Sequence, residues 1–300
     1  MNITSQLFIV IAAMCWGATG IVTRPLAAAG FTFFEMTETR SIFASVCLFA
    51  FLLLVNRKFP KFRFKDIWIF ICMGAIGSAL MGILYYYTVE TITMAAASVL
   101  LYISPYIAIV MSAFIFKEKV TLQKLTALFI AFAGCVMTVG VIDSGNLSAV
   151  GILSGIGAAF CFATQTILGK LALMRGYGPI AVSAYFYTIA AILLIPFCDL
   201  GNMISLIGES GDNLKNLLVL GIFIAVTPSL CYFKGLQKTE PGRALIIAYI
   251  EPLTAAVLGF AVFNEVLTPI RILGMALILL SLFILNIQGS STKNPSVPKN

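Results

Sequence analysis

Glu251 is the residue whose type and position in this sequence are best suited to chemistry. It stands about seven residues into an apolar run over 244–263, which would place it about 10 Å along a helix from its start. A carboxylate at that depth in an apolar medium is costly unless it is paired or hydrated. It could bind a cationic group, carry a proton or pair with an arginine. The structural alternative is a protonated carboxyl that hydrogen-bonds a backbone carbonyl.

The segment around Glu251 occurs twice in the chain. Residues 102–105 read Tyr-Ile-Ser-Pro and residues 249–252 read Tyr-Ile-Glu-Pro, 147 positions apart. Ser104 occupies the position of Glu251 in the first copy, so the repeated architecture does not require the carboxylate. The carboxylate is therefore a feature of the second copy alone.

The prolines of this repeat predict a break in each of two helices. Pro105 and Pro252 each lack an amide hydrogen and free the carbonyl four residues back, at Leu101 and Ala248. In hydrocarbon such breaks are tolerated mainly where they face protein or a wet cavity. The alternative is a packing kink that contacts no ligand.

Aromatic and polar residues inside apolar runs form the remaining candidate set. Tyr102 and Tyr249 each precede their proline by three residues and share its helix face, so we expect both rings to face a central cavity. Interfacial belts and ordinary interhelical hydrogen bonds are the alternatives for any single member. The predicted ligand-binding residues are Trp16, Arg40, Tyr86, Tyr102, Gln165, Tyr232, Tyr249 and Glu251.

Arg40 lies roughly two turns inside an apolar run over 34–55. Glu38 is two positions away, and residues at that spacing on a helix do not face each other. Arg40 therefore pairs across the helix bundle, contacts an anionic ligand, or extends to the membrane interface.

Composition excludes most classes of soluble protein and several classes of enzyme. Hydrophobic residues make up 60% of the chain and charged residues 10%, against about 25% charged residues in soluble domains. Histidine is absent, which removes histidine triads, HExxH zinc sites and histidine proton relays. The seven cysteines form no CxxC pair and fit small core residues. We therefore predict a polytopic membrane protein with no catalytic residues, no cofactor and no metal.

Ten apolar segments are long enough to span a bilayer, which needs about 20 residues. The first has no basic preceding region and no clear cleavage site, so we expect a retained helix and not a signal peptide. The segment 199–215 is predicted to be a solvated loop. The expected spans are 7–23, 34–55, 67–89, 94–116, 123–141, 150–172, 180–198, 216–236, 244–263 and 270–288.

Lysine and arginine are distributed unequally between the two ends of these spans. With the N-terminus in the cytoplasm, only Arg24, Lys215 and Arg271 fall outside, and Arg40 lies within a span. The net charge of +7 then reflects membrane orientation and not nucleic-acid binding. The 15 cytoplasmic residues are Arg57, Lys58, Lys61, Arg63, Lys65, Lys117, Lys119, Lys124, Lys170, Arg175, Lys234, Lys238, Arg243, Lys293 and Lys299.

Five spans per half require the second half to enter the membrane from the other side. Arg24 matches Lys170 and Tyr86 matches Tyr232 at an offset of 146, which extends the repeat to the first and third spans. We therefore predict an all-α membrane protein of ten transmembrane helices in two inverted five-helix repeats. The expected divisions are 1–145, 146–288 and a disordered cytoplasmic tail at 289–300.

These features resemble the drug/metabolite transporter superfamily, of the EamA-domain type, over residues 7–288. In that family a proline is followed by a glutamate and then by a glycine in the next helix. The first half lacks one glycine (Ala127) and the second lacks the other (Ser281), and we expect the glycines to serve packing. We expect a structural role at helix ends for the two glutamates. The matching residues are Pro105, Glu118 and Gly134, and Pro252, Glu265 and Gly274.

The resemblance implies a transporter that uses alternating access around a midplane cavity. The expected function is export of small metabolites such as amino acids across the inner or plasma membrane, by a monomer or homodimer, with proton coupling as one option. The partners implied are a small-molecule substrate and the lipid bilayer. Lipid-linked or nucleotide-linked substrates are the alternatives, followed by a non-transporting sensor and an integral membrane enzyme.

The charge bias predicts which loops reagents can reach. In a cysteine-free background, cysteines placed in 199–215 should react with an impermeant maleimide from outside the cell, and cysteines in 57–65 should not. The reverse labelling pattern would overturn the predicted orientation, and with it the placement of Glu118 inside and Glu265 outside.

Overall fold

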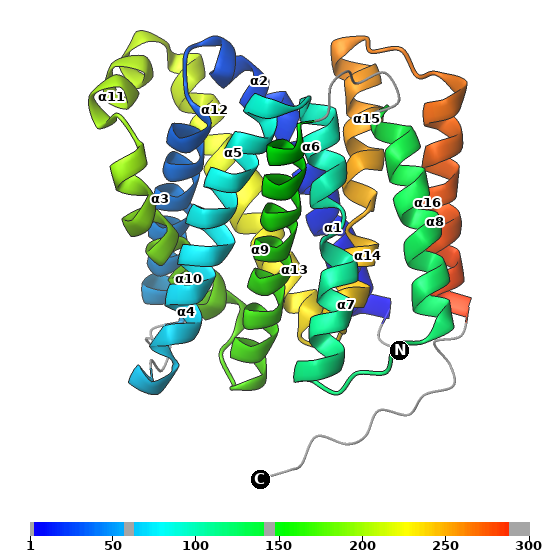
Figure 1. Cartoon of the computed structure of the whole chain (residues 1–300). Helices are drawn as coiled ribbons and strands as arrows, with labels where there is room; N and C mark the ends of the chain where they lie inside the picture. The colour runs from blue at the N-terminus through cyan, green and yellow to red at the C-terminus, as the bar shows by residue number, and fades with distance from the viewer. Residues whose placement is uncertain (1–2, 57–62, 141–147, 288–300) are drawn as a thin grey trace.

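The computed structural model describes residues 3–56, 63–140 and 148–287, and these fold into helices without any strand (Figure 1). Ten helical segments are long and apolar enough to cross a membrane. They stand side by side as a bundle, and α1 begins on the same face at which α16 ends. We call this face the terminal face and the other the opposite face.

The first half supplies five spans, three of which are built from more than one helix. A π-helical stretch, Leu52–Asn56, extends the second span, and another, Ala75–Leu80, lies within the third. The helices are α1 (Ile3–Gly17) and α2 (Thr19–Ala28), α3 (Phe33–Phe51), α4 (Ile67–Gly74) and α5 (Met81–Thr91), α6 (Met94–Leu101) and α7 (Ser104–Ile115), and α8 (Leu122–Val139).

The second half repeats this plan in the opposite direction. Its first span, α9, starts on the opposite face, whereas α1 starts on the terminal face, which confirms the inverted arrangement. The helices are α9 (Ala149–Met174), α10 (Pro179–Leu194), the connecting α11 (Leu200–Glu209), α12 (Gly211–Gly221) and α13 (Thr227–Leu236), α14 (Pro241–Ile247) and α15 (Ile250–Phe263), and α16 (Pro269–Ile287).

The ends of α7 and α15 show the repeat at the level of single backbone angles. Lys117 and Asn264, which correspond at an offset of 147, are the two non-glycine residues of the described chain with positive φ, both at 55°. The next amide in each case bonds back into the helix, from Glu118 to the Ser112 carbonyl at 3.4 Å and from Glu265 to a glycine carbonyl at 3.1 Å. The backbone amides of the two glutamates therefore close equivalent helix ends.

The helix breaks lie slightly before the prolines. The fourth span is interrupted at 102–103 and the ninth at 248–249, so Pro105 and Pro252 stand in the first turn of the second segment. Proline is well tolerated there because the first amides of a helix have no helical partner. The expected free carbonyl of Ala248 is satisfied in a tight turn by the Glu251 amide at 2.9 Å.

Close packing of α8 against α16 depends on two glycines. A Cβ added at Gly134 would lie 2.6 Å from the Gly274 carbonyl oxygen, and one added at Gly274 would lie 2.5 Å from that of Gly134. Small residues at such contacts let membrane helices approach closely. The glycines that differ between the halves thus meet each other, in agreement with the packing role expected for them.

The prediction of a solvated loop over 199–215 is wrong. Its residues form α11 and the start of α12, because the Asp199 carboxylate caps α11 by accepting from the Asn202 amide at 3.0 Å. Met203 and Leu206 of α11 are buried, and Leu206 packs with Leu26. Polar residues at the helix ends concealed this amphipathic pattern.

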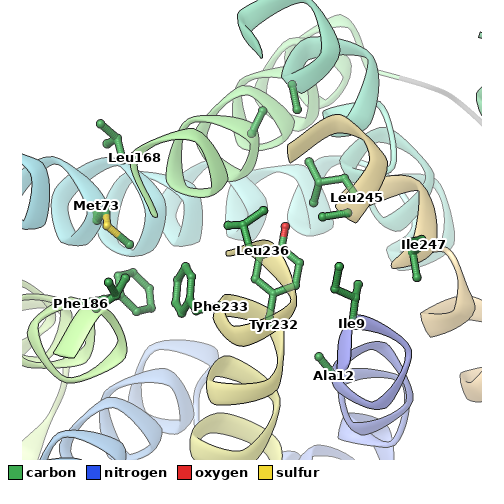
Figure 2. Packing of buried hydrophobic residues seen from close by; sticks show 14 of the residues in the cluster. Ile9, Ala12, Met73, Leu168, Phe186, Tyr232, Phe233, Leu236, Leu245 and Ile247 are labelled. Atoms are coloured by element: carbon green, nitrogen blue, oxygen red, sulfur yellow. The ribbon is translucent and has the colours of Figure 1, made fainter. Parts of the chain in front are cut away.

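The main core joins both halves. Buried residues of α1, α4, α9, α10, α13 and α14 meet around Tyr232 and Phe233 (Figure 2). A Cβ added at Gly235 of α13 would lie 2.5 Å from the Ser5 carbonyl oxygen of α1, so these two helices are in backbone contact. The core therefore ties the first span directly to the eighth.

Some predictions concern residues outside the described chain. These are the disordered tail at 289–300, the division between the halves after residue 145, and most of the basic segment 57–65. Span ends otherwise agree within a few residues, except that the first and eighth spans, Ile3–Ala28 and Gly211–Leu236, are longer than expected.

The glycine contact between α8 and α16 predicts the cost of a larger side chain. Gly134→Leu should destabilise the protein by about 1–3 kcal/mol, because the helices must separate to admit the side chain. Thermal unfolding in detergent measures this loss. Gly208→Ala on α11, where an added Cβ meets nothing within 4 Å, is the control and should not lower stability. Equal unfolding temperatures for Gly134→Leu and wild type would contradict the packing role.

Candidate functional site

The two helix breaks face each other at the centre of the bundle. The Tyr249 hydroxyl donates to the Tyr102 carbonyl oxygen at 2.5 Å, and the two rings are 5.4 Å apart with planes at 34°. The Tyr106 amide bonds to the Ile103 carbonyl instead of that of Tyr102. The carbonyl released by the break in one half is therefore satisfied by a side chain from the break in the other half.

Glu251 lies beside this contact, in the first turn of α15. Its side chain is half-buried and hydrogen-bonds the Tyr102 side chain. Tyr85 of α5 and Cys135 of α8 lie within electrostatic range of the carboxyl group. Among the described residues Glu251 has no ion pair. The carboxyl thus bonds one hydroxyl group and acts electrostatically on a further hydroxyl and a thiol of neighbouring spans, and no cation of the described chain pairs with it.

A separate small cavity of about 40 Å³ lies between α1, α9, α10 and α13. The Trp16 and Tyr232 rings meet across it at 5.2 Å, and the Tyr232 hydroxyl is 3.2 Å from that of Thr166. This volume admits only water-sized molecules. The lining residues are Trp16, Phe162, Gln165, Thr166, Phe186, Tyr187, Ser229, Tyr232 and Phe233.

The helix α1 connects the cavity with the helix breaks. Trp16 reaches the cavity, while the next residue, Gly17, packs on α15, where an added Cβ would lie 2.5 Å from the Glu251 carbonyl oxygen. A movement of α1 would therefore change the cavity and the surroundings of Glu251 together.

Arg40 forms no ion pair within the part of the chain that the structure describes. Its Nε atom is buried without a hydrogen-bond partner, as are both carboxyl oxygens of Glu38. The guanidinium charge acts on Tyr187, which lines the cavity. The geometry does not support the cross-bundle pair considered for Arg40 and leaves it near the cavity wall.

Tyr86 belongs to neither cluster. Its side chain is 38% exposed, and its ring packs on Phe34 at 5.5 Å and Tyr87 at 6.2 Å. This placement fits the alternative of an interfacial tyrosine. The repeat relates Tyr86 to the fully enclosed Tyr232, but the environments of the two residues differ.

The structure also adds residues that the sequence prediction did not select. Tyr187 and Ser229 bring hydroxyl groups to the cavity, and Tyr85 brings one to the surroundings of Glu251. Thr166 directly follows Gln165, which lies well inside its span. A search for polar residues next to Gln165 could therefore have identified Thr166 as a cavity residue. The mid-span position of Tyr187 was a similar signal, whereas nothing in the sequence singled out Ser229.

The two glutamates at the equivalent helix ends have different surroundings. Glu265, on the opposite face, forms ion pairs with Arg24 at 2.7 Å and Arg271 at 3.5 Å. Glu118, on the terminal face, has no ion pair among the described residues. Burial, and secondly the negative charge of Glu240, raise the pKa of Glu118 to about 7.

Comparison with known proteins agrees with this architecture. The model of the EamA-like transporter family matches residues 3–140 and 149–287, one match for each half. The chain belongs to this family. It is a membrane transporter with a small-molecule substrate, and its two family matches coincide with the two inverted repeats.

Relatives of this EamA-family transporter cover nearly its full length. It is 28% identical to the "Uncharacterized transporter YwfM" of Bacillus subtilis over 94% of this chain and 93% of the relative. It is 27% identical to the "Uncharacterized inner membrane transporter YicL" of Salmonella typhimurium over 94% and 95%. A solved crystal structure at 15% identity superposes with a TM-score of 0.78 over 96% of this chain and 99% of the other, which supports the fold.

The bond between the helix breaks predicts a role for one hydroxyl group. Tyr249→Phe keeps the ring but leaves the Tyr102 carbonyl without its donor, so it should cost about 1–3 kcal/mol of stability. Thermal unfolding of the purified protein tests this. Tyr86→Phe is the matched control and should unfold like wild type. The inferred bond would be contradicted if Tyr249→Phe also unfolded like wild type.

The raised pKa of Glu118 predicts a pH dependence of stability. The folded state binds this proton more tightly than an ordinary glutamate with a pKa of 4.5, so its stabilising effect is complete below about pH 4.5 and is lost as the pH rises through about 7. Glu118→Gln should therefore gain thermal stability relative to wild type at about pH 8.5 but not at about pH 4.5. An equal difference at both pH values would exclude this titration.

Proposed function

We propose that this EamA-family transporter exports small metabolites such as amino acids or related solutes by alternating access around the midplane of the membrane. The observation that carries the proposal is the contact of two helix breaks, one from each repeat, beside the unpaired carboxyl of Glu251. Broken helices at a repeat interface are where secondary transporters place their substrate sites.

The available side chains suit a solute with an amino group and an apolar part. Glu251 supplies a carboxylate for an ammonium group, and the hydroxyls of Tyr85 and Tyr102 supply hydrogen bonds beside it. Trp16 and Tyr232 supply an aromatic wall on the other side of α1. Arg40, which has no ion pair in the described chain, would favour a solute that also carries a carboxylate.

The small cavity implies that the solute enters another conformation. A cavity of about 40 Å³ cannot hold an amino acid, so α1 and its neighbours must separate to admit one. Since α1 contacts both the cavity and the backbone of Glu251, its movement would join the two clusters into one site. This motion is the step that we assign to alternating access.

Further properties follow from the charge distribution and the chemistry of Glu251. We propose that the terminal face is cytoplasmic and that the protein lies in the inner or plasma membrane, because basic residues concentrate on that face. In the absence of a bound amine, Glu251 can carry a proton, which would couple export to proton entry. A monomer contains all the residues of the proposed site, and a homodimer would leave that site unchanged.

The role of Glu251 can be tested with binding and transport measurements. In a thermal-shift screen, an amino acid or amine that binds should raise the unfolding temperature of wild type. Glu251→Gln should abolish this shift and the transport of the same solute across pH 5.5 to 8, while the protein expresses and folds normally. Glu209→Gln, a change at an exposed glutamate of α11, is the control and should behave like wild type.

Two outcomes would contradict the proposal. Unchanged transport by Glu251→Gln at every pH would leave Glu251 as a polar partner of the helix break. Stabilisation by none of the amino acids and amines, together with a shift by nucleotide-linked compounds, would replace the proposed solute class.

A further inference from the structure

Three charged residues form a compact group on the opposite face. The Arg24 guanidinium donates to Glu265 at 2.7 Å and lies 4.2 Å from the centre of the Phe263 ring. Arg271 approaches the other carboxylate oxygen of Glu265 at 3.5 Å. We call Arg24, Glu265 and Arg271 the opposite-face triad, and it connects the ends of the first, ninth and tenth spans.

The inverted repeat places the same group of charges on the terminal face. Arg24 corresponds to Lys170 at an offset of 146, while Glu265 and Arg271 correspond to residues 147 positions earlier. Each member keeps the sign of its charge. We call the corresponding residues the terminal-face triad: Lys170, Glu118 and Lys124.

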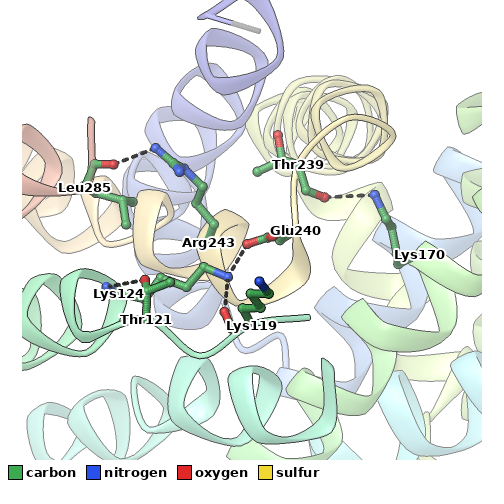
Figure 3. A network of polar contacts seen from close by, with 8 residues as sticks. All are labelled: Lys119, Thr121, Lys124, Lys170, Thr239, Glu240, Arg243 and Leu285. Carbon is green, nitrogen blue, oxygen red and sulfur yellow. Dashed lines mark hydrogen bonds and ion pairs between the residues drawn. The ribbon is translucent and has the colours of Figure 1, made fainter. Parts of the chain in front are cut away.

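The terminal-face triad is not assembled. The ammonium group of Lys170 instead donates to three backbone carbonyls at the end of α13 and in the turn before α14, those of Leu236 at 2.7 Å, Thr239 at 2.9 Å and Gln237 at 3.2 Å. Lys124 forms its ion pair with Glu240 (Figure 3). Glu118 remains close enough to both lysines to feel their charges, but it pairs with neither.

The charges on the two faces differ at Glu240. It precedes α14 at the N-cap position, and its counterpart at the N-cap of α6 is the uncharged Thr93. No acidic residue therefore stands at the corresponding place to take Arg271 away from Glu265. Glu240 pairs with Lys124 in this conformation, and the partly buried carboxyl of Glu118 has no ion pair in the described chain.

We propose that the two triads assemble alternately, and that their exchange controls which side of the transporter is closed. This inference rests on the proposed alternating access. In the conformation described here the opposite-face triad is assembled. In the other, Lys170 and Lys124 leave their present partners for Glu118, while Arg24 leaves Glu265 and takes up backbone carbonyls of the segment 90–93, the counterpart of the segment that now binds Lys170.

The physical basis is an exchange between two sets of partners of similar strength. Lys170 exchanges backbone carbonyls for a carboxylate, and Arg24 makes the reverse exchange. Lys124 exchanges the carboxylate of Glu240 for that of Glu118, so each of these three cations keeps a partner in both conformations. Ion pairs that are partly exposed to water contribute little net stability, so neither triad prevents the change.

The two triads stand on different spans, but α8, which carries Lys124, packs closely along α16, which carries Arg271. The ninth span also connects the two faces, since Glu240 precedes it and Glu265 follows it. Assembly on one face is therefore expected to oppose assembly on the other.

The rival explanation is that both glutamates are fixed helix caps that act independently. A cross-linking experiment separates the two explanations without any solute. In a cysteine-free background, Glu118→Cys with Lys170→Cys reports how often the terminal-face pair approaches, through the rate of copper-phenanthroline cross-linking in membranes. Adding Glu265→Gln, which weakens the opposite-face triad, should raise this rate several-fold by shifting the population towards the other conformation.

The control is Glu209→Gln, which changes an exposed glutamate of α11 on the opposite face and should leave the rate unchanged. An unchanged rate with Glu265→Gln would overturn the proposal, because independent caps cannot influence each other across the membrane. An equal increase with Glu209→Gln would overturn it as well, since any loss of charge on that face would then suffice.

A reciprocal measurement uses variants that leave the first pair intact. Arg24→Cys with Glu265→Cys reports the opposite-face pair, and Glu240→Gln releases Lys124 for Glu118. Cross-linking of the opposite-face pair should then become several-fold slower, and an unchanged rate would contradict the exchange. A failure of both measurements beside a normal Glu251-dependent thermal shift would reject the exchange and leave the proposed function standing.

Discussion

A backbone carbonyl that has lost its helical donor must find another partner in the membrane, because hydrocarbon supplies none. This constraint explains the centre of the molecule. The break in the fourth span leaves the Tyr102 carbonyl without its helical amide, and the hydroxyl of Tyr249, the corresponding residue of the other half, takes its place. The second half therefore supplies the donor that the break in the first half requires, and this bond holds the two breaks together.

The remaining architecture can be understood from this central contact. The two breaks can meet only if the ninth span approaches the fourth, and α1 then packs against α15 through Gly17. Glu251 follows Tyr249 by two residues, so its carboxyl lies next to the contact and hydrogen-bonds Tyr102. A carboxyl group within the ninth span is thus placed where the two halves join, and a relative movement of the halves would change its surroundings.

Much of the fold could be predicted because it follows from length, hydropathy and repetition. The ten spans and their inverted order follow from patterns that are visible in the sequence. The two broken helices are likewise indicated by single residues, Pro105 and Pro252. The helix α11 was missed because its apolar residues alternate with glycine and polar residues over fewer than three turns. Leu26, against which Leu206 of α11 packs, belongs to another span, so no local sequence pattern could predict this contact.

The site could be predicted only in part, since side chains are brought together by helix rotation. Tyr102, Tyr249 and Glu251 share one segment motif and were found together. Tyr86 was expected to resemble Tyr232, but the two helices present different faces, and Tyr86 packs at the exposed side against Phe34. The repeat conserves backbone geometry, as at Lys117 and Asn264, more strictly than it conserves side-chain environment.

The central claim is that the paired helix breaks lie on the path of the solute. Ser104 tests it most directly, because it is buried and corresponds to Glu251 in the other half. In a cysteine-free background, Ser104→Cys should react slowly with a small charged thiol reagent from either side of the membrane, and a transported solute should protect it. Ser183, equally buried on α10, is the comparison position and should stay unreactive as cysteine. No reaction at position 104 from either side, during active transport, would contradict the claim.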